Sequence, residues 1–365
     1  RRAAEALAAE LAAFPQHGLR ADRPSANTQW GLELDTALRD ETRGGVAVID
    51  SGETRAGATR FAGGAGRHGV FGSSPGAAGL GSGSVEKRGR VGDSEIASEE
   101  HGSGDRPFVL VHGYSGCRQD FDPVIPELAK LGRTLVPDLR GHGGSSRPED
   151  PGSYSYATLV DDLRGFLDAL GIDRCDLLGH SMGGMMMLRF VLAHPQRVAS
   201  LVLMDTTPRA LEGVERESFS TAWQIARQAG METLQRSLQA RLANTAERSP
   251  SDVRVEEEWG ERFFAHHRHR FLSMDPEAYA RLGPVMYDEK PVTERLGEIR
   301  CPTLVMVGAE DRGFLAAADL LEQGIPGAHR ETIPEADHHP QRENPEAWLA
   351  AIRAHLARAR GGSGS

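Results

Sequence analysis

The stretch Cys175-Asp-Leu-Leu-Gly-His-Ser-Met-Gly183 decides the fold predicted for this chain. A short strand pattern is followed by a Gly-x-Ser-x-Gly turn, and a helical pattern runs on from Met182. Such a turn lifts the serine side chain clear of the sheet, and a Cβ at Gly179 or Gly183 would collide with neighbouring backbone. The following helix N-terminus directs N–H groups toward a developing oxyanion. We therefore predict that Ser181 is a nucleophile; the other interpretation is a helix N-cap serine.

Short apolar runs alternate with helical patterns on both sides of this turn. The predicted strands are residues 107–112, 134–137, 175–178, 198–204 and 303–307. Fully apolar strands that alternate with helices predict an α/β protein with a mostly parallel, doubly wound sheet. Its core would comprise residues 91–208 and 296–360. Between them, residues 209–295 show only helical patterns and are predicted to form an inserted helical cap over the substrate entrance.

Composition excludes several classes of function. The 365 residues carry 42 Lys+Arg and 52 Asp+Glu, a net charge of −10, which argues against nucleic-acid binding. No apolar stretch approaches the roughly 20 residues of a membrane-spanning helix. The three cysteines form no Cys-x-x-Cys pair, which argues against a disulfide framework and against a cysteine-based zinc site. This cysteine usage favours a reducing compartment, the cytoplasm. We expect no metal and no cofactor, and a small molecule as the substrate.

Two further runs admit a chemical interpretation. His266-His-Arg-His-Arg270 could suggest a metal or phosphate site, but we expect a solvated charged face on a cap helix. Met185-Met-Met187 could suggest thioether ligands, but we expect core packing within the helix after Ser181.

The two ends of the chain differ from this core. Glycines are concentrated before the core, so residues 73–90 are predicted to be a Gly/Ser-rich linker and residues 361–365 a flexible tail. Residues 1–72, with Ala13-Phe-Pro-Gln16, Gln29-Trp-Gly-Leu32 and Gly66-Arg-His-Gly69, resemble the C-terminal tail of enoyl-CoA hydratase/isomerase (crotonase) proteins. That resemblance implies a helical and irregular extension without a catalytic motif. The alternative is a disordered Ala/Gly-rich extension.

A serine nucleophile needs a base, and the base needs an orienting acid. Asp311 follows the strand 303–307, at the carboxyl end where open α/β sheets keep their active sites. Glu310 is the expected bystander, and Asp205, after the strand 198–204, is the second candidate acid. The base lies in the loop before the last helix, where chemistry alone leaves His338 and His339 open.

Taken in chain order, these motifs resemble the α/β-hydrolase-fold serine hydrolases of the esterase/lipase type over residues 85–360. The resemblance rests on His112-Gly-Tyr-Ser-Gly116, on Asp138-Leu-Arg-Gly-His-Gly143, on the serine turn and on the Asp and His loops. In that family Glu-x-Pro follows five residues after the catalytic histidine, so Glu343-Asn-Pro345 selects His338. Asp337 stands where the family commonly has glycine, which leaves the backbone of that loop and the choice against His339 in question.

The resemblance also implies an oxyanion hole and an activity. After His112 and Gly113, the backbone N–H of Tyr114 would join that of Met182 as a donor to the oxyanion. The implied activity is acyl transfer from a small or medium ester, lactone or thioester, since dehalogenases and epoxide hydrolases of this fold carry aspartate at position 181. Alternatives are a carbon–carbon bond hydrolase, a cofactor-free haloperoxidase or perhydrolase, and, from another class, a non-catalytic binding protein. The sequence indicates no oligomeric state.

Overall fold

The computed structural model describes residues 84–211, 216–243 and 248–361, together with residues 36, 42, 46–49 and 51. The chain divides into two compact units, Arg1–Gly81 and Ser82–Ser365. In the first unit the described residues include a helical segment at 46–49. The crotonase-like tail predicted for 1–72 otherwise lies outside the described residues.

The second unit is built on one eight-stranded sheet with the order β1-β2-β4-β3-β5-β6-β7-β8. Strand β2 runs antiparallel to both of its neighbours, β1 and β4. The remaining pairs of neighbours, which join β4, β3, β5, β6, β7 and β8 in that order, are parallel. The central strands are buried along their whole length, which explains their continuous apolar runs. The strands are β1 (Val85–Val91), β2 (Ser94–His101), β3 (Phe108–Val111), β4 (Thr134–Pro137), β5 (Cys175–His180), β6 (Val198–Met204), β7 (Thr303–Gly308) and β8 (His329–Ile333).

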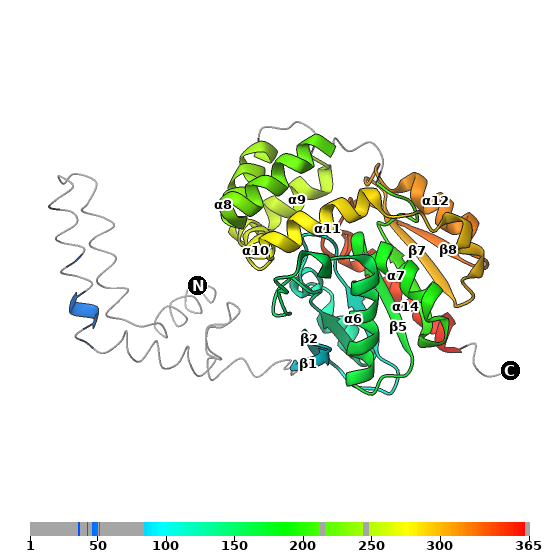
Figure 1. Cartoon of the computed structure of the whole chain (residues 1–365). Helices are drawn as coiled ribbons and strands as arrows, with labels where there is room; N and C mark the ends of the chain where they lie inside the picture. The colour runs from blue at the N-terminus through cyan, green and yellow to red at the C-terminus, as the bar shows by residue number, and fades with distance from the viewer. Residues whose placement is uncertain are drawn as a thin grey trace. The chain divides into compact units, whose positions relative to one another are not determined.

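Helices cover both faces of this sheet, as the sequence predicted (Figure 1). One face packs against α6 (Tyr156–Ala169), α7 (Met182–Ala193) and α12 (Leu315–Gly324). The other face packs against α5 (Ile125–Leu131) and α14 (Pro345–Gly361). Met185, Met186 and Met187 are buried in the first of these two cores. Their predicted role as core residues is confirmed.

Short helical turns complete the connections between these elements. They are η3 (Arg118–Phe121), η4 (Pro151–Ser153), η5 (Pro195–Arg197), η6 (Thr293–Glu298) and α13 (Pro340–Glu343).

A helical insertion separates β6 from β7, in agreement with the predicted interval. It comprises α8 (Arg216–Ala243), α9 (Pro250–Trp259), α10 (Glu261–Leu272) and α11 (Pro276–Asp288). The helical pattern is interrupted at Gly260, which adopts a φ of 54° and separates α9 from α10. A left-handed glycine ends a helix at little steric cost, so this single residue overrides the helical pattern around it.

A buried charge ties the last helix to the strand that precedes Ser181. Asp176 of β5 is fully buried and accepts a hydrogen bond from Ser200 Oγ at 2.8 Å. Its other carboxylate oxygen accepts from Arg360 Nη2 of α14 at 2.9 Å and lies 3.3 Å from Arg106 Nε. Two guanidinium groups therefore compensate one buried carboxylate.

The structure corrects the start of the core. Residues 85–90, predicted to belong to a linker, form β1, which pairs with β2 from Val85↔Glu100 to Val91↔Ser94. The glycine content misled the prediction, because Gly89 lies buried against Phe166 and Val91 packs against Gly165. The rest of the predicted linker, 73–83, lies outside the described residues. Among the described helices, none has the length and apolarity needed to cross a membrane.

The packing of β1 on α6 gives a test of this correction. A Cβ at Gly89 would lie 2.7 Å from Phe166 Cδ2 and 3.2 Å from the backbone Cα of Phe166. We expect Gly89→Leu to lower the free energy of unfolding by about 2 kcal/mol, measured by urea unfolding, because it overpacks a fixed backbone. The matched control is Arg90→Ala at the next, exposed position. Equal unfolding curves for the two variants would contradict a structural role for β1.

Candidate active site

Ser181 occupies a strained turn between β5 and α7. Its φ of 54° and ψ of −119° place a non-glycine residue in an uncommon region of backbone space. A Cβ at Gly179 would lie 2.6 Å from the carbonyl oxygen of Gly183, and one at Gly183 would lie 2.5 Å from that of His112. Only glycine fits at either position, for the steric reason that the sequence suggested.

The last residue of β6 and the segment that follows it support this turn. The backbone N–H of Ser181 donates to the Met204 carbonyl at 2.9 Å, and the Thr206 hydroxyl donates to the Ser181 carbonyl at 2.7 Å. Thr206 also fills the space beside Gly184, where an added Cβ would meet it at 2.6 Å. The turn is thus fixed from the neighbouring strand as well as by its own glycines.

The loop after β3 lies directly against Ser181. A Cβ at Gly113 would come within 3.0 Å of Ser181 Cβ, so the backbone of this loop is in contact with the serine. His112 is buried and accepts a hydrogen bond from the Leu139 N–H at Nε2, 3.1 Å, which leaves Nδ1–H to donate to the Gly113 carbonyl at 2.8 Å. Burial lowers the pKa of His112, consistent with this neutral form. His112 therefore holds the loop in place.

Tyr114 connects the same loop to the helical insertion. Its hydroxyl donates to the Tyr279 carbonyl of α11 and accepts from Trp223 Nε1 of α8 at 3.1 Å. Its ring stacks on that of Tyr279 with centroids 4.8 Å apart. Its backbone carbonyl contacts His142 Nε2 at 2.5 Å. The side chain of Tyr114 is thus anchored to the insertion, while its backbone belongs to the loop beside Ser181.

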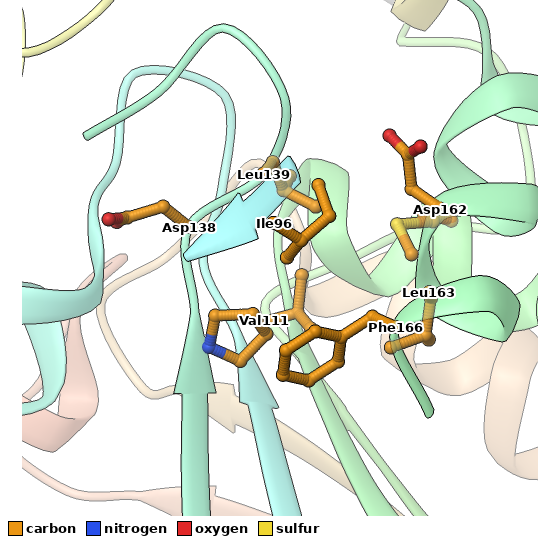
Figure 2. Close-up of a pocket in the computed structure, with 9 residues that line it drawn as sticks. Ile96, Val111, Asp138, Leu139, Asp162, Leu163 and Phe166 are labelled. Atoms are coloured by element: carbon orange, nitrogen blue, oxygen red, sulfur yellow. The ribbon is translucent and has the colours of Figure 1, made fainter. Parts of the chain in front are cut away.

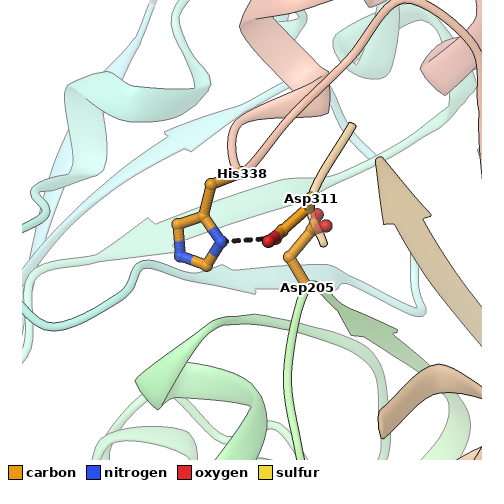
Figure 3. A group of neighbouring side chains, drawn as sticks. All are labelled: Asp205, Asp311 and His338. Atoms are coloured by element: carbon orange, nitrogen blue, oxygen red, sulfur yellow. Dashed lines mark hydrogen bonds and ion pairs between the residues drawn. The ribbon is translucent and has the colours of Figure 1, made fainter. Parts of the chain in front are cut away.

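Asp311 and His338 meet at the carboxyl ends of β7 and β8. His338 Nδ1 lies 2.7 Å from Asp311 Oδ2. Figure 3 draws this contact as a dashed line between the two side chains. The carboxylate is nearly buried, whereas about a third of the His338 side chain is exposed. The loop that carries His338 reaches the serine turn because His180 Nε2 donates to the His338 carbonyl at 2.7 Å. Within the described residues, the Ser181 hydroxyl and the His338 imidazole form no hydrogen bond; such contacts often tighten only with substrate.

His339 has a different environment from His338. It is partly buried, and its Nε2 accepts a hydrogen bond from Arg270 Nη1 of α10 at 3.3 Å. Burial, reinforced by Arg342 and Arg270, lowers the pKa of His339 well below its ordinary value. No carboxylate is hydrogen-bonded to its ring among the described residues. Of the two candidate bases, only His338 is paired with the predicted acid.

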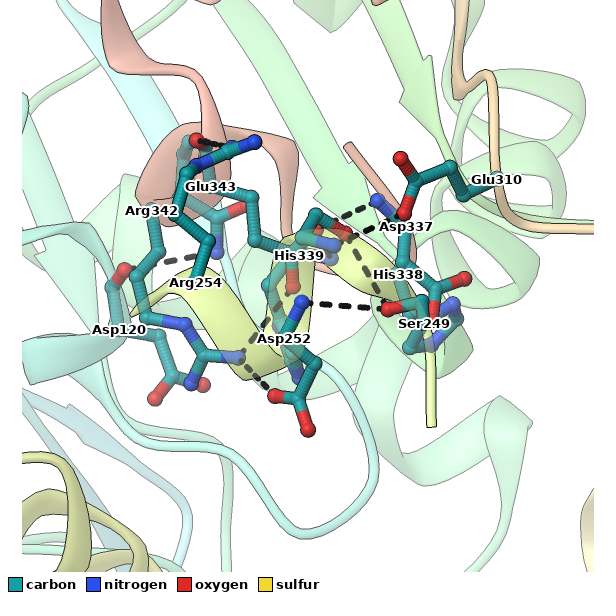
Figure 4. A network of polar contacts seen from close by, with 12 residues as sticks. Asp120, Ser249, Asp252, Arg254, Glu310, Asp337, His338, His339, Arg342 and Glu343 are labelled. Carbon is teal, nitrogen blue, oxygen red and sulfur yellow. Dashed lines mark hydrogen bonds and ion pairs between the residues drawn. The ribbon is translucent and has the colours of Figure 1, made fainter. Parts of the chain in front are cut away.

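The side chain of Glu343 holds the backbone of the loop that carries His338. Its Oε2 accepts from the backbone N–H groups of Asp337 at 2.6 Å and His339 at 3.2 Å, and the network around it is drawn in Figure 4. Asp337 keeps a negative φ, so aspartate fits where the related family commonly has glycine. The glutamate that served as a spacing marker in the sequence is therefore the group that shapes the loop.

The insertion also holds this loop. Arg254 of α9 donates to the carbonyl oxygens of Glu335 at 2.8 Å and Glu343 at 2.7 Å. Glu310, the predicted bystander, accepts from the backbone N–H of Ser251 at 3.0 Å. Glu310 thus contacts the insertion, whereas its neighbour Asp311 contacts His338.

A buried ion cluster joins α10 to η3, and here the sequence prediction was wrong. His266 and Arg270 were expected on a solvated face, but their side chains are largely buried and reach Asp120 at 3.0 Å and 3.2 Å. Burial opposes ionisation of Asp120, but Arg270 and His266 outweigh it and hold its pKa below the usual range. His267 is also enclosed, and burial lowers its pKa to about 2. Arg268 and His269 behave as predicted, since both are exposed.

Two other features of the described residues could hold a ligand. The carboxylates of Asp205 and Asp311 and the His338 ring bring one ligand-type atom each within 4.8 Å of one another, a spacing that could also hold a metal ion. The 2.7 Å contact from Nδ1 to Oδ2 already occupies one such atom of His338. A small, mostly apolar cavity lies between the sheet and α6 (Figure 2). It is lined by Ile96, Val111, Pro137, Asp138, Leu139, Asp162, Leu163, Phe166 and Met186, none of them a predicted site residue.

Sequence reasoning missed several residues that hold this site together. Thr206 braces the serine turn, His180 anchors the histidine loop, and Asp120 receives the cations of α10. A signal existed for His180, which stands inside the Gly-x-Ser-x-Gly turn. The partnership of Asp120 with Arg270 joins residues 150 positions apart and left no local pattern.

Comparisons with known proteins identify the fold family. A model of the alpha/beta hydrolase fold family matches residues 106–345. A 2-hydroxy-6-oxononadienedioate/2-hydroxy-6-oxononatrienedioate hydrolase of Escherichia coli is 28% identical over 75% of this chain and 94% of its own. An enol-lactonase from Burkholderia xenovorans superposes with a TM-score of 0.64 at 25% identity, over 74% of this chain and all of that one. A thermophilic esterase from Thermogutta terrifontis gives 0.64 at 30% identity, over 76% and 98%. The chain therefore belongs to the α/β-hydrolase fold family and is a hydrolase of that fold.

Proposed function

We propose that the protein is a serine hydrolase in which Ser181, His338 and Asp311 form the catalytic triad. The observation that carries this proposal is the 2.7 Å contact between His338 Nδ1 and Asp311 Oδ2. That contact fixes the imidazole with Nδ1 protonated and leaves Nε2 free to accept the Ser181 proton. Ser181 stands at the start of α7, on the strained turn that exposes a nucleophile.

The reaction would proceed by acyl transfer. Ser181 Oγ attacks the substrate carbonyl carbon while its proton moves to His338 Nε2. The tetrahedral intermediate collapses, and the leaving alkoxide or thiolate takes that proton from His338. A water molecule, deprotonated by His338, then releases the acid and restores Ser181.

Backbone N–H groups of Met182 and Tyr114 would stabilise the oxyanion. Met182 is the first residue of α7, where the helix dipole favours negative charge. The loop of Tyr114 lies against Ser181, because a Cβ at Gly113 would come within 3.0 Å of Ser181 Cβ. Donors that are already in position lower the barrier by several kcal/mol, on the order of 3 for each donor.

The substrates proposed are small or medium carboxylic esters, lactones or thioesters. Similarity to an esterase and to an enol-lactonase supports this class. We propose no cofactor, because proton transfer and carbonyl addition need none.

Hydrolysis of a carbon–carbon bond is the second candidate. It is supported by the relative that hydrolyses 2-hydroxy-6-oxononadienedioate, a diacid without an ester bond. The same triad could serve either reaction. Purified protein assayed with p-nitrophenyl esters and with a hydroxy-oxo-dienoate would rank the two candidates by kcat/KM.

We further propose that α8–α11 form a cap over the substrate entrance. The support is their contact with two loops of the site: Trp223 and Tyr279 bind Tyr114, and Arg254 binds the loop of His338. Arg270 and Asp120 would hold the cap against the core by a buried ion pair.

Covalent labelling tests the nucleophile. A fluorophosphonate probe should label the wild-type protein at one site, and Ser181→Ala should abolish the label, because only an activated serine reacts. Gel fluorescence and intact mass give the stoichiometry, and thermal unfolding checks that the variant is folded. Equal labelling of the variant, or none of the wild type, would refute the proposed function.

The adjacent histidines provide a matched pair for the base. We expect His338→Gln to lower kcat/KM for an ester by about 10⁴-fold, because the serine loses its proton acceptor. We expect His339→Gln to change kcat/KM by about threefold, which corresponds to less than 1 kcal/mol, because glutamine can also accept a hydrogen bond from Arg270. Steady-state kinetics at neutral pH measure both variants. The reverse ranking would assign the base to His339.

Two arginines of α10 test the attachment of the cap. We expect Arg270→Ala to lower the free energy of unfolding by about 3 kcal/mol, because it leaves Asp120 buried with less compensation. Arg268→Ala, whose ion pair with Glu232 is exposed, should cost about 0.5 kcal/mol or less. Arg270 helps to keep Asp120 ionised, so the deficit should be largest at neutral pH and shrink in acid, where the Asp120 carboxyl of the variant takes up a proton. Chemical unfolding at several pH values measures this, and similar costs for the two variants would contradict the role of Arg270.

A further inference from the structure

A second carboxyl group lies beside Asp311. Asp205 follows β6 directly, is completely buried, and adopts a φ of 45°, which is unusual for a non-glycine residue. Its backbone is held by a hydrogen bond from its N–H to the Met306 carbonyl at 2.9 Å. Figure 3 shows its carboxyl group next to that of Asp311. The strained backbone points the side chain at the acid of the proposed triad.

The two oxygens of this carboxyl group have unequal partners. Oδ1 accepts from the backbone N–H of Gly308 at 2.9 Å. Oδ2 is buried, and no N–H or O–H donor of the described residues reaches it. The group that faces the carboxyl is the carboxyl of Asp311. Two carboxylates cannot share a hydrogen bond unless one of them carries a proton.

The distribution of partners decides which carboxyl holds that proton. Asp311 faces the His338 imidazole and accepts a hydrogen bond from it at 2.7 Å, an arrangement that stabilises a negative charge. Asp205 has one neutral backbone donor and lies deeper than Asp311. Glu343, which also acts on Asp205, is negative as well. Burial, followed by the charge of Asp311, raises the pKa of Asp205 well above its ordinary value.

We propose that Asp205 is a neutral carboxylic acid whose Oδ2–H donates a hydrogen bond to Asp311, making it a positioning residue for the acid of the site. The Asp311 carboxylate then receives two hydrogen bonds, one from Asp205 and one from His338. This fixes its rotation and hence the direction of the imidazole. The proposal rests on the proposed triad, because positioning Asp311 matters to catalysis only if Asp311 orients the base.

Asparagine at position 205 is the matched replacement for a neutral acid. Its amide can accept from Gly308 and donate to Asp311, but it cannot ionise. Folding of the wild type takes up a proton at Asp205, since the folded pKa exceeds the unfolded one. The stability contributed by this group is therefore lost as the pH rises above the unfolded value of about 3.9. The Asp205→Asn variant cannot ionise at this position, so it does not lose stability in this way.

The first measurement is stability against pH, which requires no enzymatic activity. We expect the ratio of unfolding constants, wild type over Asp205→Asn, to rise up to tenfold per pH unit between pH 5 and 8. The control is Asp173→Asn, the same chemical change at an exposed position, whose ratio should stay constant. A ratio that does not change with pH for Asp205→Asn would show that the native Asp205 is ionised and would overturn the proposal.

The second measurement is the pH profile of kcat/KM with an ester. Because Asp205→Asn would remove no charge, its acid limb should coincide with that of the wild type and its kcat should stay within threefold. Asp205→Leu, which offers no donor, should lower kcat at least tenfold with little change in KM. A shift of the acid limb to lower pH in Asp205→Asn would reveal an ionised Asp205. If the kcat of Asp205→Leu equalled that of the wild type, Asp205 would have no positioning role.

The third variant separates positioning from substitution of the acid. Asp311→Asn should be nearly inactive if Asp205 stays neutral and only supports Asp311. Activity that survives in Asp311→Asn and disappears in Asp205→Asn would make Asp205 the ionised acid and overturn the proposal. The stability measurement still stands if fluorophosphonate labelling of Ser181 fails, so the failure of this inference and that of the proposed function are distinguishable.

Discussion

The close approach of α7 to the ends of β3 and β5 is the constraint on which the rest of the site depends. The backbone at Gly183 lies so near the carbonyl groups of Val111 and His112 that no side chain fits between them. This contact forces the strained backbone at Ser181 and brings the loop of Gly113 against the serine. The strain needs support from outside the turn, which Met204 and Thr206 provide from the next strand. The position of the serine is thus a property of three adjacent strands.

The site is enclosed by buried charges rather than by apolar residues alone. Asp120 of the core pairs with Arg270 of the insertion, and Arg342 of α13 lies 3.6 Å from Asp252 of the insertion. Removing one partner from such a pair costs more than the pair itself contributes, because the remaining charge stays buried. Buried ion pairs therefore fasten the insertion to the core, while Tyr114 links the insertion to the loop beside Ser181.

Sequence patterns predicted those parts of the protein that depend on neighbouring residues. The strands around Ser181 and the helix from Met182 to Ala193 followed from local apolar runs, and the structure contains them with nearly the predicted bounds. Spacing from Glu343 selected His338, and the structure supplies the physical link, since Glu343 binds the backbone of that loop. Composition misassigned residues 85–90, because a buried glycine in a strand and one in a linker look alike. The burial of His266 and Arg270 could not be predicted, since it depends on Asp120, which is far away in the sequence.

The pairing of Asp176 with residues from three parts of the chain affects the order in which the protein can fold during synthesis. Arg106, Ser200 and Arg360 all contact this one carboxylate in the strand that leads to Ser181. Translation produces Arg106 before Asp176, but it produces Arg360 long after both. Until then the central strand holds a charge that is incompletely compensated, which disfavours its final burial. Full compensation of this charge therefore waits until α14 has been synthesised and docks, and a nascent chain without α14 lacks one of the two guanidinium partners of Asp176.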